Sequence, residues 1–152
     1  MIKVFVPGIP QPQGSKVSRQ GPHQKFPVVV ESNPKVEPWR QAITKALGEH
    51  TVWFGEVVVE LIFKFPRPLS HYGTGRNAGT LKDNRQYASM ITKPDLDKLI
   101  RAVDDACTHV LWHDDSQITE IRAAKFYVQP DEEPGVLITV WNGEGVRPQS
   151  VS

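Results

Sequence analysis

Aspartates are concentrated in one part of the chain, in a spacing that suits a metal site. Asp95 and Asp97 stand close together, and the adjacent pair Asp114 and Asp115 follows further along. Mg²⁺ prefers oxygen ligands and keeps several of its waters, so a few carboxylates suffice to hold it. Such a site makes a bound water more acidic and offsets charge on a leaving oxygen. The aspartates therefore indicate metal-dependent hydrolysis of a phosphodiester.

A simpler explanation exists for Asp95 alone. Pro94 and Asp95 also suit the first turn of a helix, where a carboxylate stabilises the structure by about 1 kcal/mol as an N-cap or through the helix dipole. The neighbouring aspartates favour the metal site over this explanation. Other well-defined sites are excluded, because the sequence has no EF-hand loop and no Walker, GxSxG or HExxH motif.

The segment after Pro94 has the clearest helical periodicity in the chain. Its apolar residues fall on one stripe, at Leu96, Leu99, Ile100, Val103, Ala106, Cys107 and Val110. Four charged residues are predicted to project away from that stripe, namely Asp97, Arg101, Asp104 and Asp105. If the following strand runs back along the start of this helix, Asp114 and Asp115 come within reach of Asp95 and Asp97.

The remaining elements indicate an α+β fold. Apolar and β-branched runs predict strands over 2–6, 26–30, 57–65, 118–128 and 135–141, the last two as a hairpin. A second helix is predicted over 38–48, and loops over 7–24 and 69–92, the latter long enough to suggest a functional reason. We expect a single domain over 1–144, with two helices on a mixed or mostly antiparallel sheet, and a disordered tail over 145–152.

Size and charge narrow the function further. A chain of 152 residues and 17.1 kDa is the size of one domain. It has no apolar run long enough to span a membrane, and its one cysteine, Cys107, cannot form an internal disulfide, so we expect a cytoplasmic protein without membrane partners. The net charge of +1 alone does not indicate nucleic-acid binding. However, basic residues predominate between Lys64 and Arg101, and acidic ones between Asp104 and Glu144. A metal-dependent phosphodiesterase needs such a distribution, but on charge pattern alone ordinary solvated surface is the better explanation.

The stretch KPDLDKLIRAVDDA over 93–106, with WHDDSQ over 112–117 and Lys125, resembles the RusA family of Holliday junction resolvases. The resemblance implies a RusA-like homodimer that resolves four-way DNA junctions by paired symmetric nicks in recombination and repair, with Mg²⁺ or Mn²⁺ as cofactor. The catalytic aspartates of the family correspond to Asp95, Asp97 and Asp115. Asp114, which we include as a metal ligand, and Asp105 match further acidic positions.

This sequence departs from the family at a functional lysine, where it has Arg101. Arginine keeps the positive charge and can bind a phosphate with two hydrogen bonds, but it cannot readily lose a proton. We therefore expect Arg101 to stabilise charge in the transition state rather than to act as an acid or base.

Seven basic residues are candidates for contacts with DNA phosphates. They are Lys16, Arg19, Arg67, Arg76, Lys93, Lys98 and Lys125. Taken one by one, each is also explained as ordinary solvated surface. His71 and His113 are expected to be exposed loop residues, since no second histidine stands at zinc spacing.

Two other functions remain open at this point. One is an endonuclease with the same chemistry that cuts flaps or replication forks. The other is a non-catalytic protein that binds branched DNA, whose aspartates bind metal only for folding.

Overall fold

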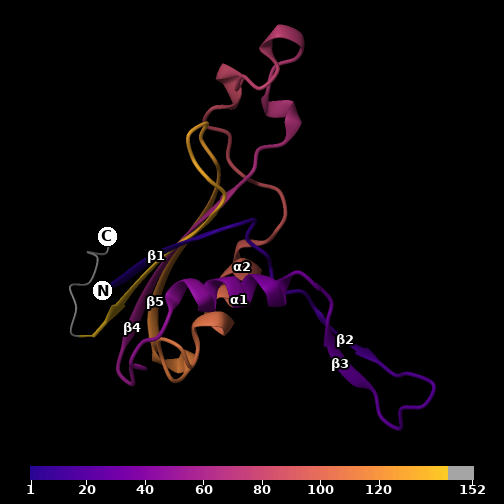
Figure 1. Ribbon diagram of the computed structural model, residues 1–152, viewed down its shortest axis with the longest axis vertical. Coiled ribbons are helices and arrows are strands. Elements are labelled where there is room, and N and C mark those ends of the chain that lie inside the picture. Colours follow the sequence, from indigo (N-terminus) through magenta and orange to yellow (C-terminus); the bar gives the residue numbers. More distant parts are fainter. Residues whose placement is uncertain (144–152) are drawn as a thin grey trace.

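A four-stranded mixed sheet lies at the centre of the protein, in a computed structural model that describes residues 1–143 (Figure 1). Its strands are β1 (Ile2–Pro7), β4 (Val57–Phe65), β5 (Ile118–Tyr127) and β6 (Gly135–Asn142). They stand in the order β1-β6-β4-β5, with β4 and β5 parallel and the other pairs antiparallel. The predicted α+β class and mixed sheet are confirmed; the predicted tail over 145–152 lies outside the described residues.

Alternation along β4 determines which face of the sheet is covered. Val57, Val59, Leu61 and Phe63 are fully buried on one face, as expected for every second residue of a strand. Helices α1 (Val36–Leu47) and α2 (Leu96–Cys107) lie in front of this face (Figure 1) and close the core over it. Within residues 1–143, no helix is long and apolar enough to cross a membrane.

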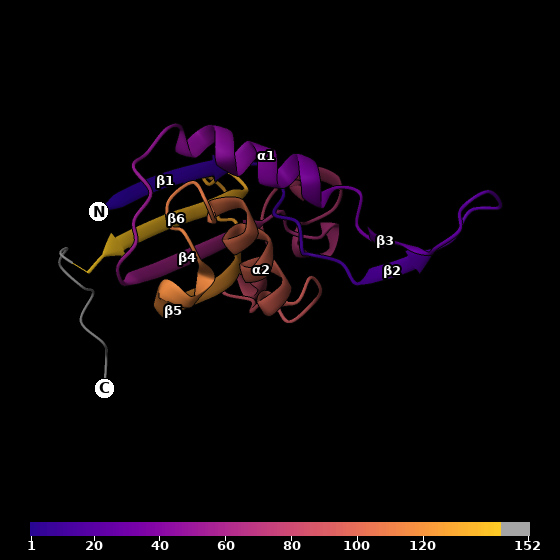
Figure 2. The same cartoon turned by 90° about the horizontal axis from the view of Figure 1, so that it is seen from below.

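A small hairpin projects from the sheet at the end nearest the start of α1 (Figure 2). It consists of β2 (Lys16–Arg19) paired antiparallel with β3 (Val28–Glu31). The prediction of a strand over 26–30 corresponds to β3, but β2 lies where the sequence predicted only loop. The strand was missed because it is short and is surrounded by the prolines, glycines and glutamines that usually mark turns.

The predicted hairpin of 118–128 with 135–141 is wrong. Both strands exist, but β4 lies between β5 and β6, and β6 pairs with β1 on its other side. Alternation of apolar residues tells which face of a strand is buried, and it is the same whichever strand is the neighbour. The pairing therefore could not be read from the pattern.

Residues 69–92 form an extension beyond the end of the sheet, which we call the arm (Figure 1). It contains three short 3₁₀ helices, Leu69–His71, Gly75–Asn77 and Asp83–Arg85, in place of a structureless loop. The arm is held at its base by Arg67, which is only 8% exposed. The guanidinium donates from Nε to the carbonyl of Val128 (2.7 Å) and from Nη1 and Nη2 to those of Arg85 (2.7 Å) and Gln86 (2.9 Å).

His71 is part of the same buried contact. Arg67 Nη1 donates to His71 Nδ1 at 3.1 Å, and the histidine is 6% exposed. Burial, and secondarily the charge of Arg67, lower the pKa of His71. The expectation that His71 is an exposed loop residue is therefore wrong, because the arm folds back over it.

Candidate metal site along helix α2

Asp95 stands immediately before α2, at its N-cap position. Among the described residues it forms no side-chain capping bond, and its carboxylate is more than half exposed. Its contact with Lys98, 3.8 Å across the surface, is worth little in water. The side chain of Asp95 is therefore available to a ligand.

Lys125 of β5 fixes the backbone that leads to Asp95. Its Nζ donates to the carbonyl oxygens of Thr92 (2.6 Å) and Pro94 (2.8 Å). Hydrogen bonds from a charged donor are about twice as strong as neutral ones. The predicted role of Lys125 was a DNA contact; the structure gives its ammonium two backbone partners, which position the start of α2.

The pair Asp114 and Asp115 lies at the other end of α2, and its first member caps a short helix. The helix η4 (Asp115–Gln117) begins after Asp114, whose side chain accepts from the backbone N–H of Ser116 at 2.8 Å. This hydrogen bond lowers the pKa of Asp114. Its carboxylate is therefore negative at neutral pH and already has one partner.

Gln117 secures the same turn against the rest of the protein. Its Oε1 accepts from the backbone N–H of Asp114 at 2.8 Å, and its Nε2 donates to the carbonyls of Trp53 and Gly55, each at 2.8 Å. These bonds use both ends of the amide. The residues DDSQ thus form a rigid turn that presents Asp115.

Asp115 faces α2 from this turn. Its Oδ1 accepts from Thr108 Oγ1 at 2.5 Å and from Trp112 Nε1 at 3.1 Å. Within the described residues no hydrogen bond to its Oδ2 is seen, so that oxygen remains available. From the sequence we expected Asp115 to lie near the start of α2. In the structure it lies at the end of the helix, because its partner Thr108 immediately follows the last turn.

Two shallow pockets follow one side of α2 and connect its aspartates. The Asp97 pocket, about 530 Å³, is lined by Asp97, Arg101, Asp104 and Gln13 among others. The Asp115 pocket, about 350 Å³, is lined by Asp115, Arg101 and Asp104 together with the start of β5. Because Arg101 and Asp104 line both pockets, they connect the pocket of the predicted ligand Asp97 with that of Asp115.

Asp104 does not project into solvent as predicted; it is only 9% exposed. Burial, followed by the charges of Asp115 and Asp105, raises its pKa to about 7, and Arg101 opposes the shift. Position 104 is one helical turn from Ile100 and close to Cys107, so it lies at the edge of the apolar stripe. The first residues of β5 lie beside it and line the same pocket. The sequence placed Asp104 on the charged side of the helix without identifying it as a candidate ligand.

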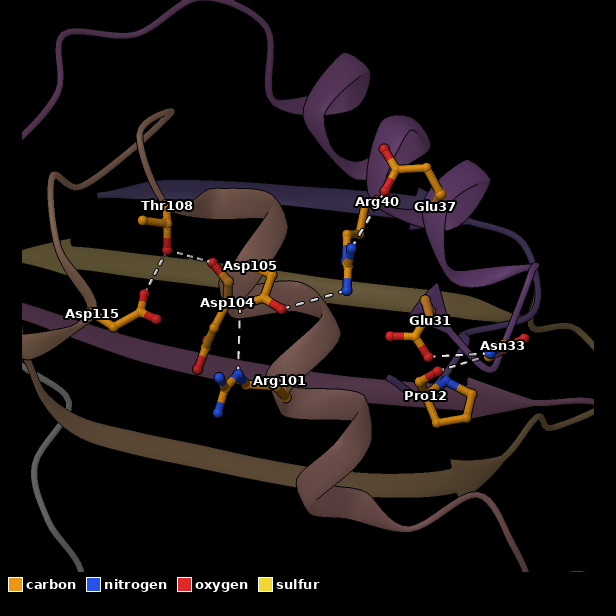
Figure 3. A network of polar contacts seen from close by, with 10 residues as sticks. All are labelled: Pro12, Glu31, Asn33, Glu37, Arg40, Arg101, Asp104, Asp105, Thr108 and Asp115. Carbon is orange, nitrogen blue, oxygen red and sulfur yellow. Dashed lines mark hydrogen bonds and ion pairs between the residues drawn. The ribbon is translucent and has the colours of Figure 1, made fainter. Parts of the chain in front are cut away.

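Asp105, on the adjacent side of α2, has a different environment. Its carboxylate lies 3.5 Å from Arg40 Nη2 of α1 and 3.6 Å from Arg101 Nε (Figure 3). These ion pairs link the two helices and hold Arg101 next to the pockets. Arg101 itself is 67% exposed, so its other nitrogens can reach a phosphate.

The oxygen-rich side of α2 suits a hard divalent cation held partly by waters. Among residues 1–143, no group of three or more histidine, cysteine, aspartate or glutamate side chains could by itself enclose a metal ion. Mg²⁺ is bound through one or two carboxylates and several waters in many sites, and Asp104 and Asp115, which line one pocket, fit such a site. Within the described part of the chain, the buried Oδ1 of Asp104 and Oε1 of Gln13 also lack hydrogen-bond partners, which a bound cation would explain.

The predicted DNA-binding residues differ in how accessible they are. Arg76, Lys93 and Lys98 are exposed, whereas Arg67 is buried and bonded to carbonyls. The backbones of Lys16 and Arg19 lie in β2, and their side chains are outside the described part of the structure.

The raised pKa of Asp104 predicts a pH-dependent effect of Asp104→Asn on stability. The folded protein holds the proton more tightly than the unfolded chain, so stability due to Asp104 is fully present below the ordinary pKa of 3.8 and lost by about 7. In thermal melts with EDTA, Asp104→Asn should therefore match wild type near pH 4 and melt at a higher temperature at pH 8. Asp83→Asn, which removes an exposed carboxylate in the arm, is the control and should show no such divergence. Parallel melting curves for Asp104→Asn and wild type across this range would contradict the burial argument.

The chain is similar to known proteins over most of its length. A family model described as endodeoxyribonuclease RusA matches residues 7–141, which include both pockets and all the aspartates discussed above. A protein of Bacillus subtilis (strain 168), the uncharacterized protein YqaN, is 28% identical over 142 residues, covering 91% of this chain and 94% of that relative.

Proposed function

The chain belongs to the RusA family of endodeoxyribonucleases, and on this basis we propose that it resolves four-way DNA junctions by paired nicks that require Mg²⁺ or Mn²⁺. The observation that carries the proposal is the row of carboxylates along one side of α2, with the arginine of position 101 among them. Metal-dependent hydrolysis of a phosphodiester needs carboxylates that hold the metal ion and a positively charged group, here Arg101, that holds the phosphate.

In this proposal Asp95, Asp97 and Asp115 are ligands of the divalent cations bound along α2, and Asp114 contributes at the edge of the site. A bound Mg²⁺ or Mn²⁺ supplies positive charge and a more acidic water for hydrolysis. The protein's own contribution is to fix the ligands: Thr108 and Trp112 orient Asp115, and Lys125 fixes the backbone before Asp95. Arg101 stabilises charge on the phosphate.

Phosphate contacts are proposed for the exposed cations near the site and on the arm, Arg76, Lys93 and Lys98, and for Lys16 and Arg19 of the hairpin. We expect junction binding to weaken steeply as salt rises, because each neutralised phosphate releases condensed counterions. Fluorescence anisotropy of a labelled junction with Ca²⁺, measured between low and high salt, checks this. An affinity that does not change with salt would contradict the role of these cations.

A homodimer is proposed because paired cuts on opposing strands call for two active sites related by a two-fold axis. Light scattering at micromolar concentration, with and without junction DNA, measures the mass directly. A monomer under both conditions would count against paired cutting by one assembly.

A comparison of substrates tests the proposed activity. Four-way junctions, flaps, replication forks and linear duplex are incubated at one salt and Mg²⁺ concentration, and the nicks on each strand are mapped. The proposal predicts symmetric nicks on the junction and much slower cutting of the others. Preferential cutting of flaps or forks would identify a different structure-specific nuclease, and tight binding of the junction without cutting would identify a binding protein.

A further inference from the structure

Asp104 has an unusual environment for an aspartate in a helix. It is 9% exposed, and its Oδ1 is buried without a hydrogen-bond partner in the described structure. Burying an unpaired carboxylate is unfavourable, so buried charges are normally paired or coordinate a metal. The free oxygen therefore indicates a missing partner.

The charged side chains around Asp104 indicate that the missing partner is positively charged. Burial is the main cause of the raised pKa of Asp104; among the neighbouring charges, Asp115 and Asp105 raise it further and Arg101 lowers it. Arg101 forms its ion pair with Asp105, at 3.6 Å, rather than with Asp104. Acidic neighbours therefore outweigh basic ones, and an added cation would remove the imbalance.

The lining of the two pockets shows where a cation could reach Asp104. Asp104 lines the pocket of Asp115 as well as that of Asp97. In Figure 3 its side chain lies next to Arg101, on the side of α2 on which Asp115 is found. Gln13 adds a second buried oxygen, Oε1, to the Asp97 pocket, and this oxygen has no hydrogen-bond partner among the described residues.

We propose that Asp104 is a further ligand of the divalent cations bound along α2, shared with Asp115 in the pocket that both residues line. This inference rests on the proposed metal-dependent function and extends its ligand set. The predicted ligands Asp95 and Asp97 lie at one end of α2 and Asp115 lies at the other. Asp104 adds a carboxylate between these two ends, so that the ligands of the bound cations are closer together. Hard cations accept carboxylate and amide oxygens alike, so Gln13 suits the same role on the Asp97 side.

Cation binding can be measured without the nuclease reaction. Free Mn²⁺ is titrated into wild-type protein and quantified by electron paramagnetic resonance, which distinguishes hydrated from bound Mn²⁺. We expect Asp104→Asn to bind Mn²⁺ at least about tenfold more weakly, since even residues that only support metal ligands change affinity by about 10–100-fold. Circular dichroism confirms folding, and Asp104→Ala, which keeps a good helix former, is the second variant.

Asp105→Asn is the matched control. It removes the same charge from the adjacent position of the same helix, but Asp105 is already paired with Arg40 and Arg101. We expect its Mn²⁺ affinity to stay within about threefold of wild type, which corresponds to a change of about 0.7 kcal/mol in long-range attraction.

The outcomes are distinct. Weak binding by both Asp104 variants with near-normal binding by Asp105→Asn supports the inference. Wild type that binds Mn²⁺ while Asp104→Asn binds it equally well overturns the inference and leaves the proposed function intact. An equal loss in Asp104→Asn and Asp105→Asn also overturns it, because the effect is then one of charge alone. Wild type that binds no Mn²⁺ overturns both.

Discussion

Asp115→Asn is expected to nick a four-way junction at least about 100-fold more slowly than wild type while remaining folded, the scale on which electrostatic groups act in hydrolysis. Asparagine keeps an oxygen that can accept from Thr108 Oγ1 and Trp112 Nε1, the two bonds that orient the side chain. It removes only the negative charge and the second carboxylate oxygen. Single-turnover nicking at saturating protein, with a parallel thermal melt, measures the effect.

Asp114→Asn is the matched control for Asp115→Asn. Asparagine is as good an N-cap as aspartate, so the bond to the backbone N–H of Ser116 should persist. We expect a smaller loss of activity at this position, because Asp114 already acts as a cap. Full activity of Asp115→Asn would contradict its role as a ligand, and an equal loss in both variants would place Asp114 among the main ligands.

Arg67→Met is expected to lower the free energy of unfolding by about 3 kcal/mol, because a buried acceptor left without its charged donor costs about 1–3 kcal/mol. Methionine fills similar space but removes the guanidinium bonds to the carbonyls of Val128, Arg85 and Gln86. The carbonyl of Val128 then loses its charged donor, whereas those of Arg85 and Gln86 keep weaker bonds from Ala88 N–H and Gln129 Nε2. Urea denaturation measures the loss. Hydrogen exchange should show the arm opening more often than the sheet, because Arg67 joins the two.

Arg76→Met is the control for Arg67→Met. Arg76 is exposed on the arm, so its replacement should change stability by less than about 0.5 kcal/mol. It should weaken junction binding instead, if Arg76 contacts phosphates. Unchanged stability of Arg67→Met would contradict its role in holding the arm.

The sequence was sufficient for the elements that have strong periodicity. Alternation of Val57, Val59, Leu61 and Phe63 predicted β4 and its buried face, and the apolar stripe predicted α2. The family was recognised from KPDLDKLIRAVDDA and WHDDSQ, and the match over residues 7–141 confirms it. These features are local, so neighbouring residues alone determine them.

Features that depend on tertiary contacts could not be predicted in the same way. The pairing of β6 with β1 and β4 is not encoded in alternation, which is identical for any neighbour. Arg67 was expected to contact DNA, because no local pattern shows that the arm and the carbonyl of Val128 surround it. The burial of Asp104 depends likewise on how β5 lies against the border of α2.

Nicking of a synthetic four-way junction by wild type and by Asp95→Asn, each with Mg²⁺ and with EDTA, tests the central claim most directly. The exposed carboxylate of Asp95 forms no capping bond within the described residues, so its replacement should leave the fold intact. We predict paired symmetric nicks only with wild type and Mg²⁺. Nicking that persists in EDTA or in Asp95→Asn, or no nicking by folded wild type that binds the junction, would contradict a metal-dependent resolvase built on these aspartates.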